Sequence, residues 1–289
     1  MTLAAFGEIV WDVYPDKQCL GGAPLNFAAH AARHGMEAYV LSAVGDDDFG
    51  AQTLAQMRQW GVHTEGVCVH PDKPTGICEV TLDERFVPTY HLREDTAWDA
   101  IECRSLPCEP AVLYFGTLAL RSDYNRAQLT ALLAKGSFKT VFADVNIRAP
   151  FFTPETVRMA FENATIVKVS DEELPTVCNA LDLPLAADAQ SACRALARAF
   201  ANLRLVILTC GGDGAYAYDT VKDAIHFEPA VKTTVVSTVG AGDSFSAAFL
   251  QRYCDGQPLA ACMAHAAKTA AMVVSHLEAV PPYSVSDLR

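Results

Sequence analysis

A segment near the C-terminal end of the chain, residues 237–248, combines residue types that suit an anion-binding site. It reads Ser-Thr-Val-Gly-Ala-Gly-Asp-Ser-Phe-Ser-Ala-Ala, so three small residues (240–242) stand directly before Asp243. A strand-like run, 233–236, comes before them, and an apolar pattern with helical spacing follows. Strand, small-residue turn and helix N-terminus aim free backbone N–H groups at one point, which attracts an anion. A carboxylate there is typical of a general base that acts while phosphate is bound beside it.

Two simpler interpretations of this segment stay open on these residues alone. Glycines at a strand–helix turn often only let the two elements pack closely. An Asp in the first turn of a helix often only complements the helix dipole. The rest of the chain must therefore decide between a catalytic and a structural role.

Other polar residues and glycine-rich loops follow predicted strands. Asp12 and Asn26, on either side of the glycine pair 21–22, offer hydrogen bonds that suit the hydroxyls of a sugar. The loop 211–214, Gly-Gly-Asp-Gly, could lie beneath a nucleotide or its phosphates. Each station also has a structural interpretation as a turn, a cap or a solvated first helical turn.

Two further stations carry a charge. Arg148, in Asp-Val-Asn-Ile-Arg, could contact a phosphate or a substrate oxygen. Glu173 could hold Mg²⁺ through water, because Mg²⁺ gives up its hydration shell reluctantly. His30 and His34 are one helical turn apart, but no third ligand lies nearby in the sequence, which favours a packing role over a metal site.

The elements that must position these residues alternate between strand and helix, which predicts an α/β domain with a mostly parallel sheet. The expected strands are 3–10, 38–43, 112–115, 140–145, 165–169, 205–209, 215–218 and 224–227. The expected helices are 23–33, 49–60, 122–134, 153–161, 170–178, 188–201, 242–254 and 258–276. The alternation breaks at 64–92, where three strand-like runs (64–70, 76–82 and 86–92) predict a small inserted antiparallel sheet.

Composition narrows the class of protein. The chain has 289 residues, which suits one large α/β domain with an insertion, and its formal charge of −12 argues against a nucleic-acid or anionic-membrane partner. The ten cysteines are scattered without a Cys-x-x-Cys pair, as expected for buried thiols in a reducing compartment. We find neither a signal peptide nor an apolar run long enough to span a membrane, so we expect a cytoplasmic protein.

Taken together, these stations resemble the PfkB (ribokinase-type) carbohydrate kinases, and most of all their fructokinase branch. The segment 21–28, Gly-Gly-Ala-Pro-Leu-Asn-Phe-Ala, is similar to the N-terminal signature of that family, and 237–245 is similar to its more specific C-terminal signature. The inserted sheet at about 64–95 is similar to the family's lid. The resemblance covers essentially all of residues 1–289 and implies a single kinase domain with a three-layer α/β/α ribokinase-like fold.

The resemblance also implies roles for individual residues. Asp243 would take the proton from the sugar hydroxyl that attacks ATP, while Mg²⁺ accompanies the nucleotide. The remaining assignments are Gly240, Ala241 and Gly242 for the transferred phosphoryl group; Asp12, Gly22, Asn26 and Arg148 for the sugar; Ser170, Thr209, Gly211, Gly212, Gly214, His265 and Ala267 for ATP, the last two near the adenine; and Glu173 for the metal.

Two departures from the family pattern limit what is implied. Ser237 stands where the family frequently has an Asp that takes part in a monovalent-cation site, so activation by potassium stays undecided. The family motif Asn-x-x-Glu reads Ser170-x-x-Glu173 here, which keeps the Glu but changes the Asn contact.

The resemblance implies an order of expected substrates: fructose first, then 2-keto-3-deoxygluconate or another hexose, then ribose, with a nucleoside last. A catalytically inactive sugar-binding or regulatory relative is the alternative from another class. The lid carries enough apolar residues to favour a homodimer in which lids pair, as in relatives. The sequence does not decide whether Tyr90, His91 or Arg93 of the lid reaches the sugar.

Overall fold

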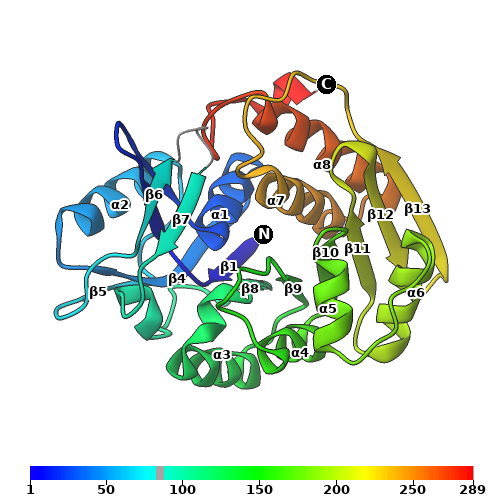
Figure 1. Ribbon diagram of the computed structural model, residues 1–289, viewed down its shortest axis with the longest axis horizontal. Helices are drawn as coiled ribbons and strands as arrows, with labels where there is room; N and C mark the ends of the chain where they lie inside the picture. Colours follow the sequence, from blue (N-terminus) through cyan, green and yellow to red (C-terminus); the bar gives the residue numbers. More distant parts are fainter. Residues whose placement is uncertain (83–87, 289) are drawn as a thin grey trace.

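A nine-stranded sheet runs through the protein in the computed structural model, which describes residues 1–82 and 88–288 (Figure 1). Neighbouring strands are parallel from β5 to β11, whereas β12 and β13 join antiparallel at one edge. In spatial order the strands are β13 (Ala224–Pro229), β12 (Gly214–Asp219), β11 (Leu205–Thr209), β10 (Ile166–Ser170), β9 (Thr140–Asp144), β8 (Val112–Gly116), β1 (Thr2–Phe6), β4 (Glu37–Gly45) and β5 (Val67–His70).

Helices cover both faces of this sheet, so the predicted three-layer α/β/α fold is confirmed. One apolar cluster joins the sheet to α1 (Ala23–Arg33), α2 (Asp48–Gln59), α7 (Ala241–Cys254) and α8 (Leu259–Val274). A second cluster lies on the opposite face against α3 (Asp123–Lys135), α4 (Pro154–Asn163), α5 (Leu174–Ala180) and α6 (Ala189–Ala199). Short 3₁₀ turns complete the chain: η1 (Ala97–Ala100), η2 (Leu118–Arg121), η3 (Gly211–Asp213) and η4 (Val285–Leu288).

Several of the helices begin where the sequence provides a cap. The side chain of Asp47 accepts a hydrogen bond from the amide of Gly50 at the start of α2, and Asp188 does the same for Ser191 at α6. Thr153 opens α4 with a reciprocal pair of bonds to Thr156. These bonds satisfy amides that have no partner inside the helix, so the helix starts are fixed locally.

The lid is a separate four-stranded sheet, and it differs from the prediction. Its order is β3 (Gln18–Gly21), β2 (Val10–Val13), β6 (Ile77–Leu82) and β7 (Pro88–Leu92), so half of it comes from the N-terminal segment. The predicted lid strand 64–70 is wrong, because β5 pairs with β4 at the edge of the large sheet. The run 86–92 is confirmed from Pro88 onward, and its first two residues lie outside the described part of the chain.

Three other expected boundaries are corrected. The run expected as the strand 3–10 splits into β1 and β2, which lie in different sheets. The run 233–236 is an exposed loop, in which the amide of Val236 donates to the carbonyl of Val274 at the end of α8 instead of joining a strand. Helix α5 begins at Leu174, because residues 170–173 form a turn closed by side-chain hydrogen bonds.

The topology fixes where a ligand can bind. Strand β1 lies between β4 and β8, so the strand order reverses beside β1. In open parallel sheets, ligands bind at such a switch point beyond the carboxyl ends of the strands. Within the described residues, no helix is long and apolar enough to cross a membrane.

Candidate active site

The N-terminal turn of α7 presents free backbone donors. Gly240 precedes the helix with a φ of +80°, and a Cβ built there would lie 2.5 Å from the carbonyl oxygen of Ala279. Only glycine fits this left-handed, tightly packed position. Among the described residues, the amides of Gly240, Gly242 and Asp243 have no hydrogen-bond acceptor. They form the kind of helix-end site that binds phosphate.

Ala241 differs from its prediction in this turn. Its amide donates to the carbonyl of Thr238 at 3.2 Å, so it is engaged inside the turn rather than free for a phosphoryl group. The free amides of the turn are therefore those on either side of Ala241 and that of Asp243, and the anion site at 240–242 stays a prediction.

Asp243 lies against Asn26, which is 217 residues away in the sequence. The Asn26 amide nitrogen donates to Asp243 Oδ2 at 2.9 Å, and this bond joins the two signature segments. Burial raises the pKa of Asp243 to about 6, against the hydrogen bond from Asn26, which lowers it. The Oδ1 atom of Asn26 is buried without a partner in the described structure, so it is free to accept a hydrogen bond from a ligand hydroxyl.

A buried ion pair supports this turn from below. Lys168 Nζ lies 2.7 Å from Asp144 Oδ1, and the two side chains are only 7% and 3% exposed. Ser246 of α7 also donates to Asp144, at 3.2 Å. A Cβ built on Gly242 would lie 3.4 Å from Lys168 Nζ, so the ammonium is a close neighbour of the first turn of α7. Burial alone lowers the pKa of Lys168, but Asp144 raises it above its ordinary value, so the lysine stays charged.

The glycine pair before α1 is held by a second buried carboxyl group. A Cβ on Gly22, whose φ is +108°, would lie 2.4 Å from the Glu8 carbonyl oxygen, so no residue with a side chain fits at this position. The Glu8 side chain is 3% exposed and accepts a hydrogen bond from the amide of Ala23 at 3.3 Å. Burial raises the pKa of Glu8 to about 7, and the nearby charge of Asp243 adds to the shift.

Asp12 reaches the site from the lid and not from the large sheet. It sits on β2, where burial raises its pKa to about 6 and the charge of Arg148 lowers it. The strand register places Asp12 and Tyr90 on one face of the lid and His91 and Arg93 on the other, because side chains alternate along a strand. Of the three lid residues in question, only Tyr90 shares the face of Asp12.

Arg148 follows β9 in a loop at the carboxyl edge of the sheet. Its positive charge lowers the pKa values of Asp12, Glu8 and Asp243, so the guanidinium lies close to all three carboxyl groups. Within the described residues its side chain makes no hydrogen bond or ion pair. The guanidinium is therefore available to a ligand, as predicted for a substrate contact.

The glycine-rich turn lies at the end of β11. Cβ atoms built on Gly211 or Gly212 would meet nothing within 4 Å, so the backbone is open to a ligand there. Gly214 has another reason to be glycine, because its Cβ would lie 2.2 Å from the carbonyl oxygen of Glu228 on β13. Thr209 is the last residue of β11, so it lies at the same edge of the sheet.

Glu173 uses both carboxylate oxygens inside the protein. Oε1 accepts from the amide of Ile147 at 2.6 Å, and Oε2 accepts from the amide and hydroxyl of Ser170 at 2.8 and 2.9 Å. In the described part of the chain, no three His, Cys, Asp or Glu side chains cluster as metal ligands. Glu173 thus ties the loops of Ile147 and Ser170 together, and its contact with Mg²⁺ through water stays a prediction.

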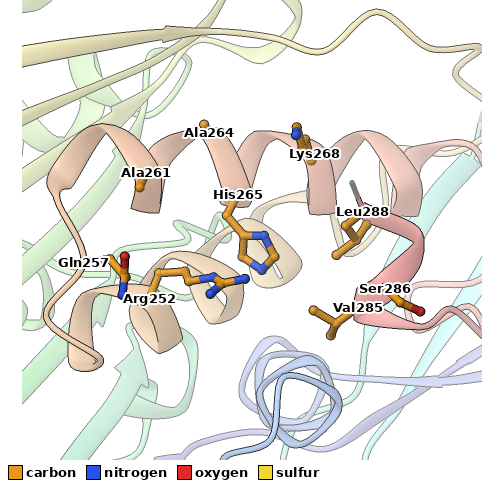
Figure 2. Close-up of a pocket in the computed structure, with 9 residues that line it drawn as sticks. All are labelled: Arg252, Gln257, Ala261, Ala264, His265, Lys268, Val285, Ser286 and Leu288. Carbon is orange, nitrogen blue, oxygen red and sulfur yellow. The ribbon is translucent and has the colours of Figure 1, made fainter.

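His265 and Ala267 do not share one site. Residues two positions apart on an α-helix are rotated by about 200° about its axis, so the side chains of His265 and Ala267 leave α8 on nearly opposite sides. His265 Nε2 lies 3.2 Å from His34 Nδ1 of α1, and its ring lines a cavity beside Arg252 (Figure 2). We therefore withdraw His265 from the predicted ATP site, while Ala267, on the other side of the helix, stays in it as a prediction.

Two residues of the site were not assigned a role from the sequence. Lys168 interrupts the apolar run Ile-Val-Lys-Val-Ser of β10, and a single lysine in a buried strand signals a buried partner. Glu8 follows Gly7 just after β1, and this Gly-Glu pair is similar to the fructokinase branch but was given no role. Its role depends on the fold of the loop above it.

Comparison with known proteins agrees with this geometry. The profile described as pfkB family carbohydrate kinase matches residues 7–285. Probable fructokinase-3 from Arabidopsis thaliana is 30% identical over 284 residues, covering 88% of this chain and 78% of that protein. Probable fructokinase-5 from the same plant is 27% identical over 272 residues, covering 86% and 81%.

Solved structures share the fold. Aminoimidazole riboside kinase from Salmonella enterica, complexed with aminoimidazole riboside and an ATP analog, has a TM-score of 0.83 and 25% identity over 100% of this chain and 98% of that one. Fructokinase from Vibrio cholerae, in a fructose, ADP and calcium ion bound form, has a TM-score of 0.84 and 23% identity over 99% and 97%. The profile match, the relatives and the joined signatures together show that this chain belongs to the pfkB family of carbohydrate kinases.

Proposed function

We propose that this carbohydrate kinase transfers the γ-phosphoryl group of ATP to a hydroxyl of fructose, with Asp243 as the general base. The observation that carries the proposal is the 2.9 Å hydrogen bond from Asn26 to Asp243, which brings the sugar-binding segment and the base together. The fructokinases among the relatives, at 27% and 30% identity, support the choice of sugar.

The proposed chemistry needs an oriented hydroxyl and a place for charge. The hydroxyl oxygen bonds to the γ-phosphorus, the bond to the bridging oxygen of ADP breaks, and the hydroxyl proton passes to Asp243. The free amides of Gly240, Gly242 and Asp243 bind the phosphoryl oxygens, and Lys168 beneath them adds positive charge. Asp12, Gly22, Asn26 and Arg148 are the proposed sugar contacts.

For the nucleotide, the residues present fit a phosphate chain at the sheet edge. The open backbone at Gly211 and Gly212 leaves room for it beside Thr209, while Ser170 acts through its bonds to Glu173. Because both Glu173 oxygens are engaged, Mg²⁺ would keep its water shell and bind mainly to the phosphates, as this ion prefers. Mg²⁺ would neutralise charge on the transferred group.

A monovalent cation has a weaker case. Ser237 offers a hydroxyl and no carboxylate, and that hydroxyl already accepts a bond from the amide of Val239 at 3.3 Å. We propose that turnover is alike in potassium and sodium salts of equal ionic strength.

A panel of acceptors tests the proposed function. Purified protein with ATP and Mg²⁺ is assayed for ADP release with fructose, 2-keto-3-deoxygluconate, ribose and aminoimidazole riboside. Fructose is expected to give the largest kcat/KM. The riboside is the second candidate, because the 25% identical Salmonella kinase covers the whole of this chain. If no acceptor gives ADP while a sugar still raises Tm, the protein is a sugar-binding relative.

The lid also carries a proposal about assembly. Tyr90 is 54% exposed in the middle of β7, the edge strand of the lid sheet, and an exposed large aromatic ring at a sheet edge suits pairing with a second lid. We propose a homodimer, with sedimentation analysis of the Tyr90→Asp protein as the check. A wild-type monomer would exclude lid pairing.

A further inference from the structure

The cavity beside His265 lies apart from the proposed chemistry, between the last turn of α7, the middle of α8 and the C-terminal turn η4 (Figure 2). Its volume is about 510 Å³, which is within the range of small-molecule sites. The rise along α7 from Asp243 to Arg252 is about 14 Å, and none of the proposed sugar or phosphate contacts lines this cavity. The nine lining residues are Arg252, Gln257, Ala261, Ala264, His265, Lys268, Val285, Ser286 and Leu288.

The lining is positive in a protein that is strongly negative. The whole chain carries −12, yet none of these nine residues is Asp or Glu, while Arg252 and Lys268 carry permanent positive charges. Every ion pair found among the described residues lies elsewhere, so neither cation is neutralised by a carboxylate there. Positive charge is thus concentrated at one place on a negative protein, with Arg252 half-buried and Lys268 exposed.

The pKa of His265 also responds to the positive charges in this cavity. Burial, followed by the charges of Arg252 and Lys268, lowers the pKa of its imidazole to about 4. Its Nε2 is held at 3.2 Å from His34 Nδ1, so the ring is fixed in place at the wall of the cavity. Figure 2 shows Arg252 from α7 and His265 from α8 directed toward one another within the space below α8.

We propose that this cavity binds a small anion with at least two negative charges, such as a phosphorylated metabolite, at a site separate from the active site. The guanidinium of Arg252 provides paired donors that match phosphate or carboxylate oxygens, and Lys268 adds a point charge. Gln257 contributes an amide, and the alanines and Val285 shape the wall around it. The occupant replaces the missing counter-charge between α7 and α8.

Titration with pyrophosphate tests the site, with the histidine ring resonances as the local probe. Ionic strength is held constant with chloride. In the wild-type protein, pyrophosphate is expected to shift the ring resonances of His265. In Arg252→Gln/Lys268→Gln the affinity for this event should fall at least about tenfold, since both charges are removed. Lys268→Gln alone, at an exposed position, should weaken it in the same direction.

A matched pair of substitutions controls for net charge. Arg58→Gln/Lys135→Gln removes the same charge from exposed positions on α2 and α3 that do not line the cavity, and it should leave the His265 response unchanged. Pyrophosphate also suits the α7 anion site, so binding that leaves the His265 resonances unmoved would overturn the proposal. Equal affinity of the cavity double variant and the wild type, or loss of binding in the control, would overturn it as well.

Discussion

The Lys168–Asp144 pair allows the sharpest prediction about this protein. Replacing Lys168 by Met keeps the length and apolar character of the stem but leaves the carboxylate of Asp144, 3% exposed, without its cation. Breaking one side of a buried pair typically costs about 3–5 kcal/mol, since the remaining charge has lost its water and its partner. The variant should therefore lose about this free energy of unfolding at neutral pH, which corresponds to a fall in Tm of roughly 10 °C.

The predicted loss depends on pH. Burial already raises the pKa of Asp144, and Lys168 works against that shift, so removing the lysine raises the pKa further. Asp144 has one pKa in the folded wild type and a higher one in the folded variant. At pH values between these two, Asp144 is still protonated in the folded variant, whereas it is ionised in the unfolded chain and in the folded wild type. Its stability then falls as pH rises. The difference from the wild type should be largest at alkaline pH and shrink as the medium becomes acidic.

Urea denaturation followed by circular dichroism measures these differences, and Asp144→Asn with the double variant closes a thermodynamic cycle. Lys168→Met/Asp144→Asn removes both charges, so its cost should be about 1–3 kcal/mol smaller than the sum of the single costs. A loss below about 1 kcal/mol in Lys168→Met, or a difference that does not change with pH, would show that the pair is screened as a surface pair is.

The other predictions concern the turn of α7. Asp243→Asn should lower kcat by at least about 10³ while sugar still raises Tm, and retained turnover would remove Asp243 from the base role. In the wild-type protein, kcat/KM should decline as pH falls through about 6, because burial sets the pKa of Asp243 there and only the ionised form accepts a proton. Gly240→Ala should destabilise by about 1–3 kcal/mol in thermal unfolding, since its Cβ would lie 2.5 Å from Ala279 O at positive φ. Gly242→Ala, whose Cβ would lie 3.4 Å from Lys168, should leave Tm nearly unchanged and reduce kcat, and a similar Tm loss in both would contradict this contrast.

Local patterns allowed most of the elements to be predicted. Helix α1 (Ala23–Arg33) agrees in both bounds with the prediction, because Pro24 in its first turn and the apolar spacing are local signals. The pairing of strands was harder. Strand β5 looked like part of an antiparallel insertion, yet it adds to the edge of the large sheet, and periodicity does not encode which sheet a strand joins.

The sequence singled out the site residues that stand in a motif, and it missed those whose role depends on a tertiary contact. Asn26 and Asp243 stand in short signatures that the resemblance assigns to one site, and the 2.9 Å bond shows that the two side chains do meet. The role of Lys168 depends on Asp144 in the neighbouring strand, and no spacing in the sequence predicts that register. His265 was misplaced for the same reason, since the face of α8 that packs on α1 is set by tertiary contacts.

Opposing contributions to the pKa of Asp243 explain how a buried carboxylate can serve at a turn that we propose to bind phosphate. Burial raises the pKa of Asp243, whereas Asn26, Lys168 and Arg148 lower it, so the free protein holds an ionised base at neutral pH. In the proposed mechanism, an arriving phosphoryl group would bring negative charge to the adjacent amides, and a like charge raises the proton affinity of a carboxylate. Asp243 would therefore bind a proton most strongly when the sugar hydroxyl must release one. Lys168 tempers the same repulsion, which is why we expect its loss to impair turnover as well as stability.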